Sequence, residues 1–473
     1  MKQHAFLILM TVLGASPALA APLTPEQKNR IDTVVTEILK SSGVPSATIS
    51  IVTHGKLEYA KAFGDQRLDG SPPTITARYP VASISKQFTA ATLLLLAEDG
   101  KLSLDDKVGK YLPSLTAADK ITIRQLLSHT SGYRDNWPQD FAFSAMYRPI
   151  TPQAILDRWA KIPLDFIPGT KWQYSNTGYV VAGLIAEMVA KEPLFAFEQR
   201  RIFRPLGMDV VEAETQRTPG DARSVTRFAM GPVRPARATA PGWGFAAGDL
   251  AMTPTELAKW NIARLNRTTL QPQSWQSQET NIAPADSGQN YGLGVSTAAV
   301  DGHRRIAHNG GWEGFLSTNR VYTDDMAAIT VMINAGFSNS QDAISDGIER
   351  ILFDKPDDAA AARGLFVMLR DGKFDRAQFT ENGNYYFTPS LLADYSTSLA
   401  PLGEPKSITR SGAAGLRGGL TIERFIFSFA DRKLLAVLRR ERGTIGGRPL
   451  IFSETLAFTS LTGRKRLKYR TSA

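Results

Sequence analysis

The chain has 473 residues, of which 43% are hydrophobic and 21% are charged, and it contains no cysteine. This composition excludes a disordered, collagenous or coiled-coil protein and is typical of a globular protein with two or three domains. Without cysteine the chain can form no disulfide bond, no thiolate nucleophile and no cysteine-based metal site.

The net charge of +10 is concentrated at the C-terminal end of the chain. Residues 361–473 hold 19 basic and 9 acidic side chains, while the preceding residues hold 36 of each. A basic tail at residues 461–473 contributes half of the surplus through Arg464, Lys465, Arg466, Lys468 and Arg470. We interpret the tail as a solvated segment, with contact to an anionic envelope surface as the alternative. We expect no nucleic-acid partner, because the chain has no recognisable nucleic-acid-binding fold.

Residues 1–20 have the pattern of a secretory signal peptide. Lys2 gives a charged start, residues 5–13 form an apolar run, and Ala18-Leu19-Ala20 has the small residues of a cleavage site. The apolar run is too short to span a bilayer. We therefore expect a secreted or periplasmic protein whose mature chain begins near Ala21.

The first elements predicted in the mature chain are a helix, a hairpin and a second helix. Thr24 opens a capping box, and an amphipathic stripe follows it as far as Gly43. Alternating apolar residues at 46–52 and 56–63 predict a hairpin. An apolar helix is expected over residues 83–99.

A helical middle section and a second set of strands follow. The apolar pattern predicts short helices near residues 123–129, 152–161 and 178–190. Later strands are predicted at 291–300, 303–308, 317–322 and 326–333. Because strands lie at both ends of this region, we predict an α+β domain over residues 21–355, with one sheet beside a helical lobe.

A smaller second domain is predicted beyond residues 354–362, where the chain is acidic and alanine-rich and its net charge changes. Helical patterns at 364–370 and 389–399 precede strand-like runs at 407–410, 420–429, 433–439 and 450–458. We therefore expect a small α+β domain over residues 361–460.

Ser83-Ile84-Ser85-Lys86 is the one S-x-x-K sequence in the chain. Positions i and i+3 share one face of a helix, so the Lys86 amine can reach the Ser83 hydroxyl. A serine hydroxyl needs a base, and a lysine can be that base if its pKa falls from about 10.4 toward about 7. A helix that begins at Ser83 also offers N–H groups to an oxyanion. An exposed helix start is the plain alternative.

Tyr174-Ser175-Asn176 is the one Y-x-N sequence. A phenol beside an ammonium can shuttle a proton, and the amide of Asn176 can bond both a lysine and a substrate carbonyl. The alternative is a partly buried core tyrosine.

His308-Asn309-Gly310-Gly311 ends a predicted strand. Paired glycines at a strand edge allow a substrate to approach the backbone closely. The Gly311 N–H can then complete an oxyanion hole with the Ser83 N–H. The alternative is a glycine bulge beside an exposed histidine.

The other sequence signals indicate neither a metal site nor a second catalytic centre. The five histidines include no H-E-x-x-H spacing, so we expect no metal. His129 lies among hydroxyl residues, but we assign it a structural role in which its ring bonds nearby backbone. No G-x-S-x-G is present, which argues against an α/β-hydrolase.

The three motifs occur in this order with spacings of 91 and 134 residues. Together they resemble the penicillin-recognising serine hydrolases, specifically the branch with class C β-lactamases, D-Ala-D-Ala carboxypeptidases, D-aminopeptidases and related esterases. The resemblance covers about residues 25–350. It extends to Leu126–Gly132, Pro168-Gly169 and Gly244–Ala251, which are typical of this branch.

The resemblance implies an antiparallel sheet of the β-lactamase/transpeptidase type, flanked by helices, and a reaction without cofactor. It implies that Ser83 is acylated and that Lys86 and Tyr174 share the general-base and general-acid work. Asn176 would orient the substrate and the lysine, and the Ser83 and Gly311 amides would hold the oxyanion. The residues implied to bind substrate are Asn176, His308, Asn309 and Gly310. The second domain resembles the NTF2-like domains often appended to this branch.

One departure from the β-lactamase pattern affects the expected substrate. His308-Asn309-Gly310 stands where β-lactamases of this branch have Lys-Thr-Gly, and a neutral histidine cannot pair with a substrate carboxylate as a lysine does. We therefore expect a peptidase or esterase acting on a small-molecule or peptide acyl substrate, with weak or absent β-lactamase activity. A catalytically silent receptor for cell-wall peptides is the alternative.

Overall fold

The computed structural model describes residues 22–137, 144–229, 231–300, 302–353, 358–379, 381–411, 415–417, 420–430, 432–445, 448–452 and 459–460. The predicted signal peptide at 1–20 and the basic tail at 461–473 lie outside the described residues. The chain divides into two compact units, of which the first ends at Phe353 and the second begins at Asp354. Within the described residues, no helix combines the length and apolar character needed to cross a bilayer.

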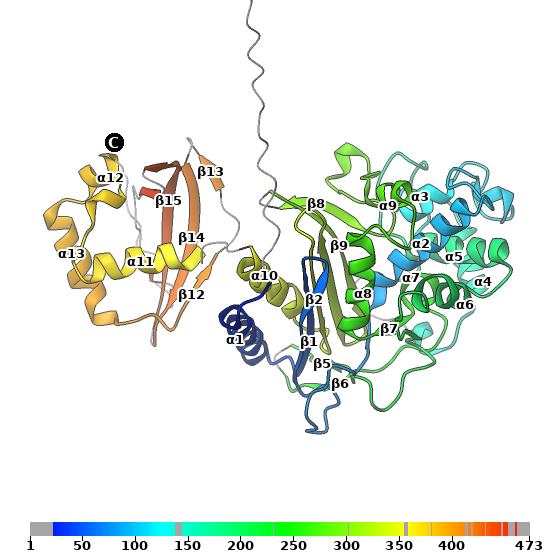
Figure 1. Cartoon of the computed structure of the whole chain (residues 1–473), viewed down its shortest axis with the longest axis horizontal. Helices are drawn as coiled ribbons and strands as arrows, with labels where there is room; N and C mark the ends of the chain where they lie inside the picture. Colours follow the sequence, from blue (N-terminus) through cyan, green and yellow to red (C-terminus); the bar gives the residue numbers. More distant parts are fainter. Residues whose placement is uncertain are drawn as a thin grey trace, which may run out of the picture. The chain divides into compact units, whose positions relative to one another are not determined.

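The first unit is built on a six-stranded antiparallel sheet with the strand order β2-β1-β11-β10-β9-β8 (Figure 1). Its strands are β1 (Ser46–Thr53), β2 (Lys56–Gly64), β8 (Ser296–Val300), β9 (His303–Trp312), β10 (Phe315–Tyr322) and β11 (Ala327–Ile333). Because β1 pairs with β11, with Ala47 opposite Ile333, strands from both ends of the unit close one sheet. This arrangement confirms the α+β class that the strand pattern predicts.

Helices cover both faces of this sheet, so every residue of β1 and β11 is buried. Helices α1 (Pro25–Ser42) and α10 (Ser340–Leu352) pack on one face, and α8 (Pro254–Leu265) packs on the other (Figure 1). Thr24 forms the predicted capping box at the start of α1, and Gly43 ends the helix with a φ of 73°.

The helical lobe surrounds α2 (Lys86–Glu98), in which every residue from Lys86 to Leu96 is buried. The other helices are α3 (Ile123–Leu127), α4 (Pro152–Ile155), α5 (Asn176–Ala190), α6 (Leu194–Glu198), α7 (Phe245–Gly248) and α9 (Pro272–Glu279). Short 3₁₀ turns lie at Val108–Lys110, Ser144–Tyr147 and Ala285–Ser287, and π-type turns continue α4 at Leu156–Ala160 and α6 at Gln199–Phe203. Because α2 is buried on every side, it forms the centre of the helical lobe.

The first unit also contains two small sheets. One has the order β3-β7-β4 and consists of β3 (Tyr79–Pro80), β7 (Leu250–Met252) and β4 (Val211–Glu212). The other pairs β5 (Val225–Thr226) with β6 (Arg234–Pro235).

The predicted start of the helix at Ser83 is wrong. Residues Ala82–Ser85 form a 3₁₀ turn, and α2 begins at Lys86. The Ile84 N–H donates to the Val81 carbonyl oxygen and the Lys86 N–H donates to that of Ser83, and these i to i+3 bonds close a 3₁₀ turn rather than an α-helix. Ser83 therefore lies in a tight turn ahead of the α-helix.

The second unit packs three helices against an antiparallel sheet in the order β12-β14-β15-β16, with β13 and β17 paired to β14 and β15. Its helices are α11 (Asp358–Arg370), α12 (Glu381–Tyr386) and α13 (Pro389–Leu399), with 3₁₀ turns at Arg376–Gln378 and Ala400–Leu402. Its strands are β12 (Ser407–Arg410), β13 (Gly415–Arg417), β14 (Leu420–Ser428), β15 (Lys433–Ile445), β16 (Arg448–Phe452) and β17 (Thr459–Ser460). The likeness to NTF2-like domains stays a prediction.

Candidate active site

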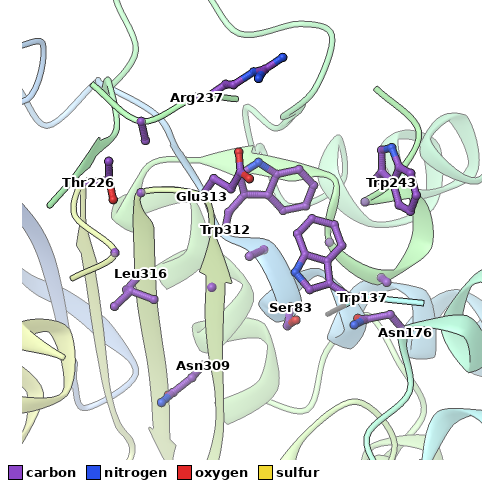
Figure 2. A pocket seen from close by; sticks show the side chains of 18 of the residues that line it. Ser83, Trp137, Asn176, Thr226, Arg237, Trp243, Asn309, Trp312, Glu313 and Leu316 are labelled. Carbon is purple, nitrogen blue, oxygen red and sulfur yellow. The ribbon is translucent and has the colours of Figure 1, made fainter. Parts of the chain in front are cut away.

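A cleft of about 930 Å³ opens in the first unit, where Ser83 lies between β9, the segment 242–248 and the loop after α3 (Figure 2). Predicted site residues gather in its wall. The described lining residues include Ser83, Tyr174, Asn176, His308, Asn309 and Gly311, together with the aromatic residues Trp137, Tyr147, Phe228, Trp243 and Trp312. The structure thus brings together motifs that lie far apart in the sequence.

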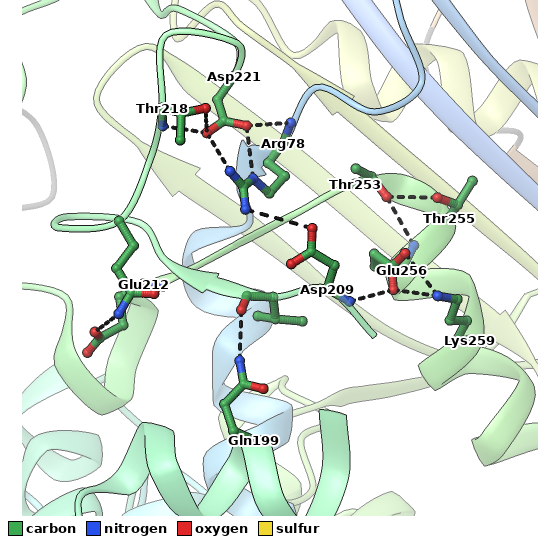
Figure 3. Close-up of polar contacts among 12 residues, drawn as sticks. Arg78, Gln199, Asp209, Glu212, Thr218, Asp221, Thr253, Thr255, Glu256 and Lys259 are labelled. Carbon is green, nitrogen blue, oxygen red and sulfur yellow. Dashed lines mark hydrogen bonds and ion pairs between the residues drawn. The ribbon is translucent and has the colours of Figure 1, made fainter. Parts of the chain in front are cut away.

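The segment that leads to Ser83 is held at two points. The Arg78 guanidinium donates to the Asp221 carboxylate from Nε at 2.9 Å and from Nη2 at 3.2 Å (Figure 3). Nearer to Ser83, the Val81 carbonyl oxygen packs on β9, where a Cβ placed on Gly310 would lie only 2.0 Å from it. The absence of a side chain at Gly310 therefore allows the turn with Ser83 to approach the strand.

Lys86 is fully buried, and its amine contacts the nucleophile candidate directly. Lys86 Nζ lies 3.0 Å from Ser83 Oγ. It also donates to Asn176 Oδ1 at 2.7 Å and to the Ala247 carbonyl oxygen at 2.7 Å. Burial lowers the pKa of Lys86 to about 7, and the negative charge of Asp135 opposes this shift. A substantial fraction of the amine is therefore neutral near pH 7 and able to accept a proton.

Tyr174 lies beside this amine, with Lys86 Nζ 4.9 Å from the centre of its ring. Burial raises the pKa of the Tyr174 phenol well above its usual range, and a hydrogen bond with Ser83 opposes the increase. The phenol therefore keeps its proton at neutral pH. Ser83 and Tyr174 line the cleft, and the buried Lys86 amine contacts both of them.

Asn176 is the first residue of α5, and Ser175 caps that helix by accepting from the Gly178 N–H. The Asn176 side chain bridges two groups: its Oδ1 faces Lys86, while its Nδ2 donates to Asp135 Oδ1 at 3.1 Å. Burial raises the pKa of Asp135, and hydrogen bonds from backbone N–H groups oppose the increase.

Sequence reasoning missed two of these partners. Asp135 lies three residues after the Leu126–Gly132 segment that carries the family resemblance, so it was within reach. The Ala247 acceptor is a backbone oxygen, for which no side-chain signal exists.

His308 is buried and held neutral. Its Nδ1 lies 2.6 Å from the Asn309 carbonyl oxygen and its Nε2 lies 2.8 Å from Tyr291 Oη. A carbonyl can only accept, so Nδ1 carries the proton and Nε2 accepts from Tyr291. Burial, together with the charge of Lys86, lowers the pKa of His308 to about 3. The departure from lysine seen in the sequence therefore leaves a neutral group at this position.

Two predicted substrate contacts have other partners. Asn309 borders the cleft, but its side-chain amide donates to the Asp342 carboxylate on α10 at 3.3 Å. Gly310 packs on the Val81 backbone and is not among the described lining residues. Successive strand residues face opposite sides, so the motif cannot direct all its side chains to one ligand. Gly311 remains at the cleft wall.

His129 has the structural role expected of it. Its Nδ1 accepts from the Ser175 N–H at 3.1 Å, and its ring centre lies 4.1 Å from that of Tyr174. Burial lowers the pKa of His129 well below its usual range, and the charge of Lys86 adds to this decrease. In the described part of the chain, no group of three or more His, Asp or Glu side chains could hold a metal ion.

Aromatic side chains form much of the cleft wall, which the motif analysis did not predict. The ring centres of Trp137 and Trp312 are 5.1 Å apart (Figure 2). The Arg237 guanidinium lies 3.6 Å from the ring centre of Tyr147. Trp312 directly follows the His308–Gly311 motif, so its nearness to the site could have been inferred from the sequence.

The sequence of this chain is similar to a family model and to several known proteins. The family model described as Beta-lactamase matches residues 31–350. Penicillin-binding protein 4* of Bacillus subtilis strain 168 is 27% identical over 344 residues, which cover 66% of this chain and 73% of that protein. Protein flp of Staphylococcus aureus strain NCTC 8325 / PS 47 is 33% identical over 198 residues, which cover 39% of this chain and 38% of flp.

Solved structures with a similar fold include two amide hydrolases. A D-stereospecific amidohydrolase from Streptomyces sp. superposes with a TM-score of 0.59 at 27% identity, covering 68% of this chain and 98% of that chain. A D-amino acid amidase from Ochrobactrum anthropi SV3 gives a TM-score of 0.62 at 24% identity, covering 70% and 99%. These likenesses confirm the fold and the relationship that the three motifs indicate.

The close contact at Gly310 predicts a selective effect of adding one methyl group. In Gly310→Ala, the new Cβ would meet Val81 O at 2.0 Å and Ser317 Oγ at 2.3 Å, so the backbone must move. We expect a loss of about 1 to 3 kcal/mol in the free energy of unfolding, measured by urea denaturation.

Gly311→Ala is the matched control, because its Cβ would meet nothing closer than Leu316 Cδ2 at 3.5 Å. We expect its stability to stay within about 0.5 kcal/mol of the wild type. Equal stabilities of the two variants would contradict the tight approach of Val81 to β9.

Proposed function

Because this chain belongs to the beta-lactamase family, whose members are serine hydrolases, we propose that it is exported and forms an acyl-enzyme on Ser83 from a peptide, amide or ester. One observation carries the proposal. The Lys86 amine, with its pKa lowered to about 7, lies 3.0 Å from the Ser83 hydroxyl. A nucleophile paired with a base of matched pKa is the arrangement that covalent catalysis needs.

Acylation would exchange one bond at the acyl carbon and move, in net terms, one proton from Ser83 to the leaving group. Lys86 Nζ takes the proton of Ser83 Oγ while the oxygen attacks the substrate carbonyl carbon. The carbonyl oxygen becomes an oxyanion, which the backbone N–H groups of Ser83 and Gly311 would stabilise. When the carbonyl re-forms, the leaving group departs and takes a proton from Tyr174, which Lys86 then restores. Hydrolysis of the acyl-enzyme by water repeats these steps in reverse and releases the acid.

The charge of the site favours substrates without a carboxylate beside the scissile bond. His308 is neutral, with its pKa lowered to about 3 by burial, so it supplies no cation where β-lactamases of this branch have lysine. Amides, peptides and esters therefore suit the site better than carboxylate-bearing β-lactams. The amide hydrolases among the structural relatives support the same substrate class.

The expected location determines which substrates the protein can meet. The signal-peptide pattern at residues 1–20 supports export, and cell-wall peptides are acyl substrates available outside the cytoplasm. The basic residues at 461–473 can in addition hold the protein near an anionic envelope surface.

Covalent labelling provides the direct test of the nucleophile. A fluorophosphonate probe is expected to label the wild-type protein and to leave Ser83→Ala unlabelled, because phosphonylation requires an activated hydroxyl. Intact-protein mass spectrometry measures the added mass, and Ser85→Ala is a nearby control that should still be labelled. Equal labelling of Ser83→Ala would discard the nucleophile.

The pH dependence of labelling reports the base. Lys86 accepts a proton only when neutral, and its pKa is lowered to about 7, so the rate should rise through pH 7 and level off above it. The raised pKa of Tyr174 predicts no loss of rate from phenol ionisation at mildly alkaline pH.

Lys86→Met and Tyr174→Phe should each lose more than about 100-fold in turnover while remaining folded. Near-normal rates in either variant would remove that residue from the mechanism.

A substrate panel separates the proposed activities. Nitrophenyl esters, D-amino-acid anilides, D-Ala-D-Ala peptides and a chromogenic cephalosporin would be compared by kcat/KM. We expect the neutral esters and anilides to exceed the cephalosporin, since the carboxylate of the cephalosporin finds no cation at His308. Preferred hydrolysis of the cephalosporin would contradict this order, and labelling without turnover of any substrate would favour the silent receptor.

A further inference from the structure

A hydrogen-bonded chain links Asp135, Asn176, Lys86 and Ser83 within the candidate active site. A neutral lysine amine has two N–H groups and one unshared electron pair. Two partners of Lys86 Nζ, Asn176 Oδ1 and the Ala247 carbonyl oxygen, are oxygens that can only accept, each at 2.7 Å. They therefore occupy both N–H groups of the neutral amine. The unshared pair is left for the third neighbour, Ser83 Oγ, at 3.0 Å.

The unshared pair of Lys86 points at Ser83 only if the oxygen end of the Asn176 amide faces the lysine. Asp135 Oδ1 accepts from Asn176 Nδ2 at 3.1 Å and from the Asn176 backbone N–H at 2.9 Å. A carboxylate faces an NH₂ group and repels a carbonyl oxygen, so it turns the Asn176 Oδ1 toward Lys86. A rotated amide would present NH₂ to the amine and take away one acceptor.

The loop that carries Asp135 is itself tied to the start of α5. His129 Nδ1 accepts from the Ser175 N–H at 3.1 Å, and Asn136 Oδ1 accepts from Thr177 Oγ1 at 3.3 Å. Asp135 Oδ1 also accepts from the Trp137 N–H at 3.1 Å. These contacts on either side hold the carboxylate against the first turn of α5.

We propose that Asp135 is a positioning residue that, through the Asn176 amide, directs the unshared electron pair of Lys86 at the Ser83 hydroxyl. The inference rests on the proposed function, because it assigns a role in the acylation of Ser83. Asp135 touches neither substrate nor the reacting atoms in this role. Two hydrogen bonds, from Asp135 to Asn176 and from Asn176 to Lys86, separate it from the amine that accepts the proton.

The charge of Asp135 has a separate and measurable effect. The titratable groups around the Lys86 amine are Asp135, the phenols of Tyr174 and Tyr179, and the imidazoles of His129 and His308. Burial keeps the two imidazoles and two phenols in their neutral forms, since it lowers the imidazole pKa values and raises the phenol pKa values. Asp135 is the group whose negative charge raises the pKa of Lys86 against the effect of burial.

Two substitutions separate orientation from charge. Asp135→Asn keeps an oxygen that accepts from Asn176 but removes the negative charge. We expect its fluorophosphonate labelling rate to keep about the wild-type plateau, while the acid limb of the pH profile moves about 1 pH unit lower. Asp135→Ala removes the acceptor, so the Asn176 amide is free to rotate, and we expect the plateau rate to fall about tenfold or more. Recovery in Asp135→Asn relative to Asp135→Ala identifies orientation as the cause.

A control and a double variant test whether the effect passes through Asn176. Asp165→Asn removes another carboxylate near the same loop, one that pairs with Arg134 at 2.8 Å, and should leave the pH profile unchanged. In an Asn176→Ala background, Asp135→Ala should slow labelling less than about twofold further, because the amide it orients is already absent. Thermal unfolding is measured for each variant. If Asp135→Ala does not fold, the plateau rate of Asp135→Asn decides: it should match the wild type, and a plateau as low as that of Asn176→Ala would contradict the orienting role.

A wild-type plateau in Asp135→Ala, a plateau in Asp135→Asn as low as that of Asp135→Ala, or losses that multiply in the double variant would each overturn the inference. These failures differ from failure of the proposed function. If Ser83 is not the nucleophile, the wild-type protein itself is not labelled at Ser83.

Discussion

The loss of water around the Lys86 amine is the constraint on which the rest of the site depends. A fully buried ammonium loses its hydration, so burial favours the neutral amine and lowers the pKa of Lys86 to about 7. Helix α2 provides this burial, because its residues from Lys86 to Leu96 are all enclosed. The acceptor oxygens of Asn176 and Ala247 each take one N–H of the neutral amine, so both of its N–H groups stay paired after the proton is lost.

The same burial sets the electrical character of the whole pocket. Tyr174 keeps its proton and His308 loses its proton for the same reason, the high cost of an ionised group without water. Neutral imidazoles and phenols therefore surround Lys86, and the negative charge of Asp135 raises the pKa of Lys86 against the effect of burial. The neutral His308 supplies no charge for a substrate carboxylate, which is why we propose neutral amides and esters as substrates. The aromatic wall formed by Trp137 and Trp312 fits this chemistry, because it offers apolar surface to the substrate.

Local signals in the sequence predicted most of the elements that carry the site. The Thr24 capping box and Gly43 bound α1 as expected, since both act within a few residues of the backbone. The start of α2 was predicted three residues early, because Ala82–Ser85 form a 3₁₀ turn ahead of the α-helix. The prediction that Asn309 binds substrate stays a prediction: its amide donates to Asp342, and the residue borders the cleft. The spacing of motifs does not reveal such partners, because they come from elements distant in sequence.

The sequence by itself determined the reactive groups and their family: a hydroxyl and an amine three residues apart, a phenol with an amide two residues later, and a histidine in place of lysine. Those facts follow from residue types and spacing, which need no fold. The tertiary structure alone decided that Lys86 loses its water, that the backbone oxygen of Ala247 accepts from it, and that Asp135 orients Asn176. Burial and hydrogen-bond direction are properties of groups brought together from distant segments. They exist only after the β-sheet and the helical lobe have closed around α2.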